Sequence, residues 1–518
     1  MEGRLMTTRS DSYDFVIVGA GTAGCVLASR LTEDAGTRVL LVEAGNRDPL
    51  PAAADPQAWP SLAGTSMDWG DVAVSVPGSP AVRLPRGRGV GGSSAINAMS
   101  FIRGHRASYD AWVAAGAKGW GFDDLLPYFK RSEHVEGRDP AVRGNGGPLR
   151  LWRVAPPHPL SETMLEAAGQ VGHPVVDDIN SGVQEGFGWA EFTIVDGRRL
   201  SAADAYLRPA LQRPNLDLVT DALVHRLLFS GERCTGVEYS LGSEVVRVDC
   251  GRDVVVAAGA IGSPQLLMRS GIGPQSHLRE VGVPIVVDLP GVGANLHDHP
   301  MTGVVYRSRQ PVVGSVGNGG GEAKGTIRTT ADVGWPDVQL FCAIAPMLGD
   351  TVPSPERGAG FTMVVAILAP FSRGSVRLAS ADPTAAPLIG PGFFSDSRDL
   401  DAAVAGLHAA RDLANTPAFA PWRDGEAQPG PEAWDDDHQL RDYVRRSVHT
   451  YFHYAGTCRM GTDEHAVVDT ELRVRGIEGL RVIDGSVMPT PVNANTNATV
   501  YGIAERAAHL LRTRASAQ

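Results

Sequence analysis

Features that mark several classes of protein are scarce in this chain of 518 residues. The five cysteines are scattered, odd in number and without C-x-x-C spacing, which predicts a reduced, cytoplasmic protein with neither a disulfide framework nor a zinc site. The longest apolar runs, 281–287 and 361–370, are far shorter than the ~20 residues of a membrane-spanning helix. The polar stretch 1–14 has no apolar segment typical of a signal peptide, so we expect a short disordered lead-in.

Charge of one sign is not concentrated anywhere either. With 47 basic and 58 acidic residues the net charge is −11, and no long run of like charge occurs, which argues against nucleic-acid binding. Lysine is rare: arginine outnumbers it 44 to 3, a ratio that indicates a GC-rich bacterial genome and says nothing about mechanism. In contrast, 43% of the residues are apolar, which is enough for sizeable cores, and the length predicts several domain-sized units or two large ones.

The clearest local pattern lies near the N-terminus. A short apolar strand over 15–18 is followed by a glycine turn, a helix from 25 to about 32 and a second buried strand over 38–42. This is the order of a βαβ unit, which places the glycine turn at the start of the helix.

Three glycines and an acidic residue indicate what kind of ligand this unit binds. Gly19 permits the tight turn, Gly21 lets the backbone approach a pyrophosphate, and Gly24 lets helix and strand pack closely. Glu43, 43 − 19 = 24 residues beyond the first glycine, is placed to accept hydrogen bonds from an adenosine ribose. The pattern predicts a dinucleotide site and disfavours NADP, but it leaves NAD and FAD as alternatives.

The pattern of expected strands and helices changes in the middle of the chain. Short apolar strands return between 216 and 257, with 244–248 and 253–257 as separate strands, whereas 302–445 alternates strands with polar helices. We therefore expect an α/β fold with a discontinuous, Rossmann-like dinucleotide-binding domain and a second, α+β domain with an antiparallel sheet flanked by helices. The expected boundaries are 12–150, 200–301 and 446–518 for the first domain, with a loop-rich insertion at about 50–85, and 151–199 and 302–445 for the second.

Seven motifs, taken together, resemble the glucose–methanol–choline (GMC) oxidoreductases, which are flavoproteins that oxidise alcohols. They come in that family's order and span nearly the whole chain, 14–511. The motifs are Val18-Gly19-Ala20-Gly21-Thr22-Ala23-Gly24, Val42-Glu43-Ala44-Gly45, Arg86-Gly87-Arg88-Gly89-Val90-Gly91-Gly92-Ser93-Ser94-Ala95-Ile96-Asn97, Ala257-Ala258-Gly259-Ala260-Ile261-Gly262-Ser263-Pro264-Gln265-Leu266-Leu267, Gly291-Val292-Gly293-Ala294-Asn295-Leu296-His297-Asp298-His299, His453-Tyr454-Ala455-Gly456-Thr457-Cys458-Arg459-Met460-Gly461 and Asp484-Gly485-Ser486-Val487-Met488-Pro489.

The resemblance implies FAD rather than NAD. Some members of the family link FAD covalently through a histidine, and the matching position here is Ile96, so we expect a non-covalent cofactor. The implied contacts place the glycines on the pyrophosphate, Glu43 on the adenosine ribose and the Val224 backbone on the adenine. The full set of expected cofactor-binding residues is Gly19, Gly21, Thr22, Ala23, Gly24, Glu43, Ala44, Arg88, Gly92, Ser93, Asn97, Ala98, Met99, Val224, Ala258, Asp484, Gly485, Asn495, Thr496 and Asn497.

Two catalytic residues are implied as well. An alcohol that is oxidised loses a proton from oxygen and a hydride from carbon, and a histidine suits the proton. The resemblance makes His453 this base rather than His449, although Tyr454 stands where the family usually has proline. Asn495 is the implied partner that holds the substrate oxygen. Asn497 is then expected to face the flavin or to cap a last helix over 501–511.

Aromatic residues surround the expected base. Phe341, Tyr451, Phe452 and Tyr454 are predicted to form a pocket for an aromatic or apolar alcohol, with ordinary core packing as the alternative. His297, Asp298 and His299 look like metal ligands, but a fourth ligand at suitable spacing is missing and the resemblance makes this stretch structural, so we expect no metal.

The expected function is FAD-dependent oxidation of an aryl, furfuryl or natural-product alcohol, with O₂ or a quinone as electron acceptor, in a monomer or homodimer. Choline is disfavoured because no acidic residue can be placed in an aromatic cage around its ammonium group. Three alternatives stay open: a hydroxynitrile lyase, a fatty-acid photodecarboxylase that uses Cys342 and Arg373, and an NAD-linked dehydrogenase.

Overall fold

The computed structural model describes residues 13–73, 82–183, 185–315, 317–318, 320–330, 334–347 and 354–515. Most of the expected lead-in (1–12) and part of the expected loop-rich insertion (74–81) lie outside the described residues. The described part of that insertion contains two short 3₁₀ helices, η1 (Pro51–Ala54) and η2 (Pro56–Leu62).

The first sheet is formed by strands from the beginning, middle and end of the chain. Its hydrogen-bonded order is β11-β2-β1-β14-β13-β12, and β25 pairs with β14. The pairs among β11, β2, β1, β14 and β25 are parallel, and β12 and β13 extend the sheet as an antiparallel hairpin. The strands are β1 (Tyr13–Val18), β2 (Val39–Val42), β11 (Leu216–Val219), β12 (Ala222–Ser230), β13 (Arg233–Leu241), β14 (Glu244–Val256) and β25 (Leu480–Val482).

One strand corrects the sequence-based expectation. The two strands expected at 244–248 and 253–257 are a single strand, β14, of 13 residues. Its first half pairs with β13 and its second half pairs with β1 and β25, so each half has hydrogen-bonding partners and no turn interrupts the strand. The sequence pattern shows apolar runs but not these partners.

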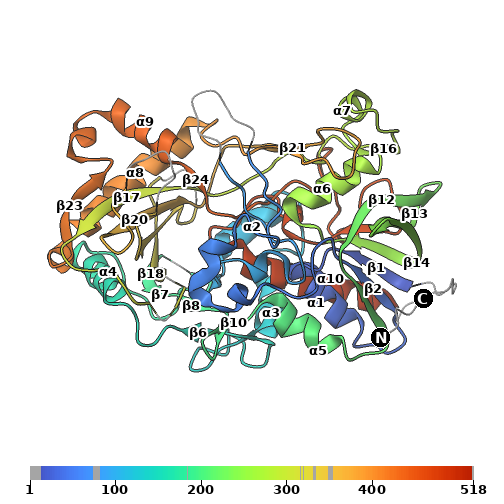
Figure 1. Cartoon of the computed structure of the whole chain (residues 1–518), viewed down its shortest axis with the longest axis horizontal. Helices are drawn as coiled ribbons and strands as arrows, with labels where there is room; N and C mark the ends of the chain where they lie inside the picture. Colours follow the sequence, from blue (N-terminus) through green and yellow to red (C-terminus); the bar gives the residue numbers. More distant parts are fainter. Residues whose placement is uncertain are drawn as a thin grey trace.

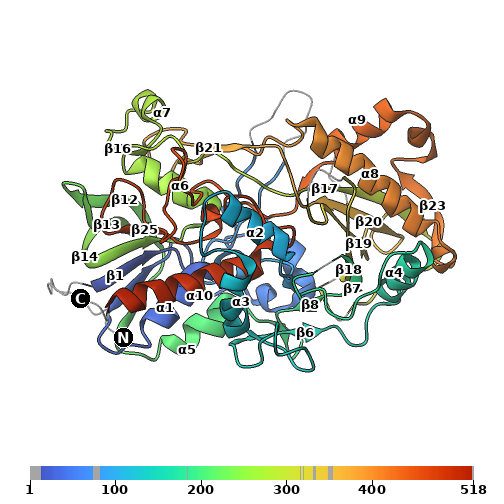
Figure 2. The same ribbon diagram turned by 180° about the vertical axis from the view of Figure 1, so that it is seen from behind.

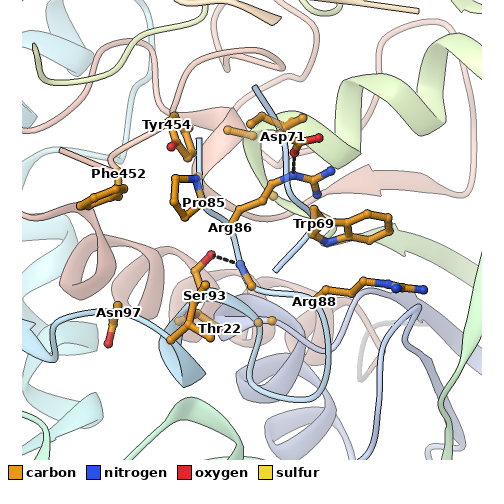
Figure 3. A pocket seen from close by; sticks show the side chains of 18 of the residues that line it. Thr22, Trp69, Asp71, Pro85, Arg86, Arg88, Ser93, Asn97, Phe452 and Tyr454 are labelled. Carbon is orange, nitrogen blue, oxygen red and sulfur yellow. Dashed lines mark hydrogen bonds and ion pairs between the residues drawn. The ribbon is translucent and has the colours of Figure 1, made fainter. Parts of the chain in front are cut away.

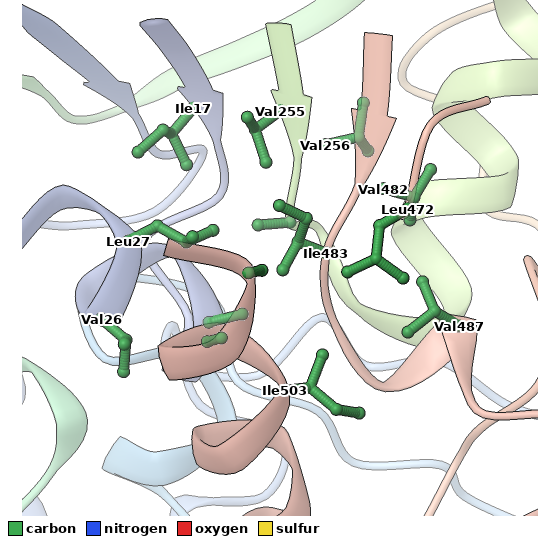
Figure 4. Close-up of a cluster of buried hydrophobic side chains, with 14 of the residues drawn as sticks. Ile17, Val26, Leu27, Val255, Val256, Leu472, Val482, Ile483, Val487 and Ile503 are labelled. Carbon is green, nitrogen blue, oxygen red and sulfur yellow. The ribbon is translucent and has the colours of Figure 1, made fainter. Parts of the chain in front are cut away.

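Two helices cover one face of this sheet and form its core. Helix α1 (Thr22–Leu31) and helix α10 (Thr496–Ala515) contact each other and bury Val26, Leu27 and Ile503 against strand residues such as Ile17 and Val255. Figure 4 shows these side chains converging between the strands and the two helices. This packing fixes the glycine turn before α1 beside the segment that leads into α10.

The second sheet is antiparallel and is covered by helices. Its order is β23-β17-β20-β19-β18-β7, and the short β24 pairs with β17. Its strands are β7 (Gly186–Trp189), β17 (Pro300–Ser308), β18 (Gly320–Ile327), β19 (Val338–Ala343), β20 (Gly360–Ile367), β23 (Arg423–Gln428) and β24 (His449–Thr450). The helices α4 (Pro159–Gln170), α8 (Ser397–Ala414) and α9 (Asp437–Ser447) pack on it through a separate buried cluster. An α/β unit with a Rossmann-like sheet and an α+β unit with an antiparallel sheet are thus both present, which confirms the expected fold class.

Shorter elements connect the two sheets. The remaining helices are α2 (Arg106–Ala114), α3 (Phe122–Ser132), α5 (Arg208–Ala210), α6 (Gly259–Arg269), α7 (Gln275–Glu280), η3 (Gly92–Ala95), η4 (Ala203–Leu207), η5 (Pro417–Phe419), η6 (Pro431–Asp435) and η7 (Gly485–Val487). The remaining strands are β3 (Ser100–Phe101), β4 (Glu133–His134), β5 (Leu149–Arg150), β6 (Trp152–Arg153), β8 (Glu191–Phe192), β9 (Ile194–Val195), β10 (Arg198–Arg199), β15 (Ile272–Gly273), β16 (Val287–Asp288), β21 (Ser375–Arg377) and β22 (Leu388–Gly390).

The two sheets lie at opposite ends of an elongated molecule. Figure 1 places β17, β20, α8 and α9 at one end and β1, β2 and β14 at the other, and the view from behind in Figure 2 shows α10 and α1 along the first sheet. Strand β24 lies in the range expected for the first domain but pairs with β17 of the second sheet. The expected domain boundaries stay a prediction. No helix in the described ranges is long and apolar enough to cross a membrane.

Candidate active site

One large cavity, of about 1010 Å³, lies where the carboxyl ends of β1 and β2 face strands β17, β18 and β19 of the second sheet. Ligands of open α/β sheets bind at this end of the strands. All residues expected to bind a cofactor, except Gly24, line this cavity. So do the expected catalytic residues His453 and Asn495 and the expected pocket residues Phe341, Tyr451, Phe452 and Tyr454.

Glycines allow two backbone segments to meet at the floor of the cavity. Gly92 has φ +52°, and a Cβ on it would lie 2.6 Å from the Cα atom of Gly21. Gly19 has φ +103°, and a Cβ there would lie 2.6 Å from the carbonyl oxygen of Ala257. Gly24 acts differently: its Cβ would lie 1.9 Å from the Gly19 carbonyl oxygen, so this position serves close packing of α1 on its own turn.

Glu43 connects these turns through hydrogen bonds to their backbone. Its buried carboxylate accepts hydrogen bonds from the backbone N–H groups of Ala20 (2.8 Å), Gly45 (2.9 Å) and Gly89 (2.9 Å). Burial raises the pKa of this carboxyl, and the three N–H donors oppose that shift. Glu43 therefore fixes the shape of the glycine turns in addition to lining the cavity.

Asp484 holds a second part of the cavity wall in place through hydrogen bonds of the same kind. It caps η7 by accepting from the Ser486 N–H at 2.8 Å, and it accepts from the Gly259 N–H at 2.8 Å and the Ser263 hydroxyl at 2.5 Å. Burial raises the pKa of this carboxyl too. The start of α6 and the turn after β25 are thus held at fixed positions on the cavity wall.

The start of the last helix differs from the expectation. Helix α10 begins at Thr496, not at 501, because Thr496 and the asparagine after it are already in the first turn. Asn495 directly precedes the helix, and Asn497 accepts a hydrogen bond from the Thr22 hydroxyl at 3.0 Å. Asn497 therefore faces the cavity from inside the helix and is not its cap.

His453 lies between two polar side chains. Its Nδ1 atom is 2.9 Å from Nδ1 of His299, and its Nε2 atom is 3.2 Å from Nδ2 of Asn495. Nothing in the sequence pattern indicated His299 as a neighbour of the base, because 154 residues separate the two histidines. Asp298 holds both histidines in place: its Oδ1 atom accepts from the backbone N–H groups of His453 (2.9 Å) and His299 (2.8 Å).

These contacts favour one tautomer of His453. The amide nitrogen of Asn495 only donates, so Nε2 of His453 accepts and the proton sits on Nδ1. That Nδ1–H then donates to Nδ1 of His299, so the proton of the neutral His299 ring sits on Nε2. The single lone pair on Nε2 of His453 accepts the Asn495 N–H at the cavity wall, and a substrate hydroxyl must displace that hydrogen bond to reach it.

Burial keeps both histidines neutral. It lowers the pKa of His299 to about 3, and it holds the pKa of His453 well below its usual value, with His299 and the Lys324 ammonium acting in the same direction. The Oδ1 atom of Asn495 is buried and has no hydrogen-bond partner in the structure. Asn495 therefore offers a free acceptor beside the Nε2 atom of His453, to which its own amide N–H donates.

Aromatic side chains form the walls next to this pair. The Tyr451 ring lies 4.4 Å, centre to centre, from the His453 ring and stacks on Phe341 at 5.9 Å. Phe452 has φ +65° and packs edge-on against Trp59 at 6.4 Å. Met99, also left-handed at φ +60°, is the second such residue on the wall, and backbone strain of this kind is typical of functional sites.

Near the glycine turns, the cavity wall contains two arginine side chains whose guanidinium groups lie over one tryptophan ring. Trp69 lies 4.4 Å from the Arg86 guanidinium and 5.3 Å from that of Arg88, and Arg86 also pairs with Asp71. Figure 3 shows this group on one side of the cavity and Phe452 and Tyr454 on the other. Ser93 accepts a hydrogen bond from the Gly87 N–H at 3.1 Å between them.

Two groups named from the sequence lie elsewhere. Cys342 points from β19 into the helix-covered core, on the opposite side of the strand from Phe341, and Arg373 donates only to backbone carbonyls near it. Neither lines the cavity, which leaves the photodecarboxylase alternative without its two candidate residues. His297, Asp298 and His299 each turn to a different partner: the Asn295 carbonyl, two backbone N–H groups, and His453.

Comparison with known proteins decides the family. Sequence profiles described as GMC oxidoreductase match residues 13–301 and 370–504. The chain belongs to the GMC oxidoreductase family. Relatives span almost its full length: it is 38% identical over 537 residues to the mitochondrial choline dehydrogenase of Mus musculus, covering 97% of this chain and 90% of that protein. It is 41% identical over 540 residues to the oxygen-dependent choline dehydrogenase of Paraburkholderia xenovorans, covering 98% and 95%.

Solved structures agree with this assignment. Pyridoxine 4-oxidase from Mesorbium loti superimposes with a TM-score of 0.92 at 37% identity, covering 97% of this chain and 99% of the other. A formate oxidase from Aspergillus oryzae, in a study of FAD modification, gives 0.91 at 28% identity, covering 98% and 99%. This GMC protein is an FAD-dependent oxidoreductase that acts on CH–OH groups.

The residues present fit FAD. The glycine floor leaves room for a diphosphate, because a Cβ on Gly21 would meet nothing nearer than 3.9 Å. The same cavity is lined by Glu43, by Asn97 and Ala98, and by Asn495, whose amide oxygen has no partner among the described residues. Ile96, the position at which the resemblance implied no covalent link, lines the cavity, and its side chain has no nucleophilic atom.

Proposed function

We propose that this enzyme oxidises an alcohol to an aldehyde or ketone, with His453 as general base and Asn495 holding the substrate oxygen. The observation that carries the proposal is the position of the Nε2 lone pair of His453, 3.2 Å from the Asn495 amide nitrogen and on the wall of the cavity. A hydroxyl group that enters between these two atoms replaces their hydrogen bond: its oxygen receives the Asn495 amide N–H, and its own proton points at Nε2.

The bound flavin supplies the hydride acceptor. Nε2 of His453 takes the hydroxyl proton, and the Asn495 amide stabilises the negative charge that develops on the substrate oxygen. His299 keeps the Nδ1 proton of His453 in place, so that Nε2 stays the accepting atom throughout. His453 and His299 are buried, and the low dielectric around their side chains strengthens the hydrogen bonds that they make.

The lining supports an aryl, furfuryl or comparable natural-product alcohol as the substrate. Phe341, Tyr451, Phe452 and Tyr454 offer ring faces and edges beside the base. Among the described residues that line the cavity, the carboxylates are Glu43, Asp71 and Asp484, and each is engaged by backbone groups or by Arg86 away from His453. A trimethylammonium group therefore meets no unengaged carboxylate among the described residues of the cavity wall, which argues against choline. O₂ or a quinone as acceptor, and a monomer or homodimer, remain part of the proposal.

An anaerobic titration of the purified, yellow enzyme tests this function. In the dark, benzyl, furfuryl and aliphatic alcohols and choline are added separately while the visible absorbance of the oxidised flavin is recorded. We expect the aryl or furfuryl alcohols to bleach it and choline to leave it unchanged. Bleaching by choline alone contradicts the proposed substrate class, and a fully loaded flavin that no alcohol bleaches contradicts alcohol oxidation.

A further inference from the structure

Lys324 is a buried cation on the cavity wall that the proposed chemistry does not use. It is one of only three lysines in the chain, lies in β18, and is 5% exposed. Its Nζ atom contacts the Tyr451 hydroxyl at 3.1 Å and lies 4.6 Å from the centre of the Phe341 ring. The ammonium group thus sits among the aromatic side chains next to His453.

This lysine has no counter-charge within the described parts of the chain. No carboxylate there lies within 4.0 Å of Nζ, whereas the buried Arg103 and Arg143 both pair with Glu133. The Tyr451 hydroxyl donates its own proton to Gln339 Oε1 at 2.7 Å, so it receives one N–H of Lys324 on a lone pair. An ammonium group has three N–H donors, and two of them therefore remain available on the cavity side.

A cation at this position is costly for the free enzyme. Burial alone lowers the pKa of Lys324 to about 7, and the charge also lowers the pKa of His453, the group that must accept a proton. A methionine would fill the same space between Phe341 and Tyr451 without either penalty. Both penalties are offset if a negative charge enters the cavity with the substrate.

We propose that Lys324 determines specificity by binding an anionic oxygen, a carboxylate or a phenolate, carried by the alcohol substrate. The Tyr451 side chain connects the two ends of this subsite, because its hydroxyl touches Lys324 and its ring lies against His453. An aromatic alcohol lying along Tyr451 presents its CH–OH group to His453 and its anionic substituent to Lys324. This inference rests on the proposed function and narrows its substrate class.

Para-substituted benzyl alcohols that differ in the charge or ionisability of one substituent test this subsite. The set is 4-(hydroxymethyl)benzoate, 4-(hydroxymethyl)phenol, the neutral 4-(hydroxymethyl)benzamide and a benzyl alcohol with a trimethylammonium group. Each is used to reduce the flavin of the wild-type holoenzyme, Lys324→Met and the control Lys118→Met, an exposed lysine outside the cavity. We expect the wild type and Lys118→Met to favour an anionic alcohol over the amide in kcat/KM, and Lys324→Met to reduce that preference by about 10- to 100-fold, as charged hydrogen bonds usually contribute.

The outcomes separate this inference from the proposed function. Preference for the benzoate identifies a carboxylate, and preference for the phenol that rises as the pH approaches the phenol's pKa of about 10 identifies a phenolate. An equal loss for all four alcohols in Lys324→Met, or no preference for the anions in the wild type, overturns the subsite while leaving alcohol oxidation intact. If no alcohol reduces the wild-type flavin, the proposed function itself fails. Should Lys324→Met not fold, competitive inhibition of the wild type decides: benzoate must bind at least about 10-fold more tightly than benzamide, and equal binding contradicts the inference.

Discussion

The Nδ1 atoms of His299 and His453 lie 2.9 Å apart, and the two imidazole rings meet edge to face at 84°. Only one of these nitrogens can carry the proton of a hydrogen bond between neutral rings. Because Asn495 donates to the opposite nitrogen of His453, the proton belongs to His453 Nδ1, and its Nε2 is the accepting atom. Under the proposed function, His299 is a positioning residue that acts on the substrate through His453.

Replacing His299 tests this positioning role. In His299→Leu the Nδ1 proton of His453 loses its acceptor, and we expect flavin reduction to slow by about 10-fold or more, up to the 10²–10⁴-fold that a general base contributes. His299→Asn places an amide oxygen near the lost nitrogen and is expected to restore much of the rate and the wild-type pH profile of kcat/KM. Equal impairment of both variants, with an unshifted pH profile, would reduce His299 to a packing role.

The close approach of the two glycine segments predicts the effect of a small substitution. Gly92→Ala puts a methyl group 2.6 Å from the Gly21 backbone, and we expect loss of bound FAD or insoluble protein. Gly137→Ala is the matched control, because Gly137 also has positive φ, +69°, but nothing lies within 4 Å of its Cβ position. The control is expected to cost only the ~1 kcal/mol of left-handed strain and to keep its flavin. Full flavin content in purified Gly92→Ala would contradict the proposed close contact with the cofactor.

The charge of Lys324 predicts a shift in pH dependence. His453 accepts a proton only when neutral, so activity falls as the pH drops through its pKa. The groups that face its ring are His299, Tyr451, Asn495 and Lys324, and only Lys324 is a cation at the acidic pH at which His453 titrates. Lys324→Met removes a charge that lowers the pKa of His453, and the acid limb of kcat/KM for a neutral alcohol should move to higher pH. A limb that stays in place, or moves to lower pH, contradicts the electrostatic coupling.

Local sequence patterns predicted most of the first sheet and the region of the site. The βαβ order around 13–42 and the family of the chain were readable because short-range spacing determines them. The division of β14 was wrong, since its continuity depends on strands that pair from distant parts of the chain. The sequence showed neither that His299 contacts His453 nor that Lys324 contacts Tyr451, because each of these pairs is separated by more than 120 residues.

The direction in which a strand residue points is a second property that could not be predicted from the sequence. Phe341 and Cys342 are neighbours and both were candidates for the site, but successive residues of a strand point to opposite faces. The pairing of β19 between β18 and β20 turns Phe341 to the cavity and Cys342 to the helices. Without that register, neither direction can be chosen from the sequence.

The most direct test of the central claim is the rate of anaerobic flavin reduction in His453→Ala. An alcohol that bleaches the wild type is mixed rapidly with the variant and with His449→Ala, a control in which the neighbouring histidine of β24, which does not line the cavity, is removed. The account predicts that both variants keep their FAD, that His449→Ala is reduced at close to the wild-type rate, and that His453→Ala is slower by roughly 10²–10⁴-fold. Reduction of His453→Ala at the wild-type rate would contradict the assignment of His453 as the base.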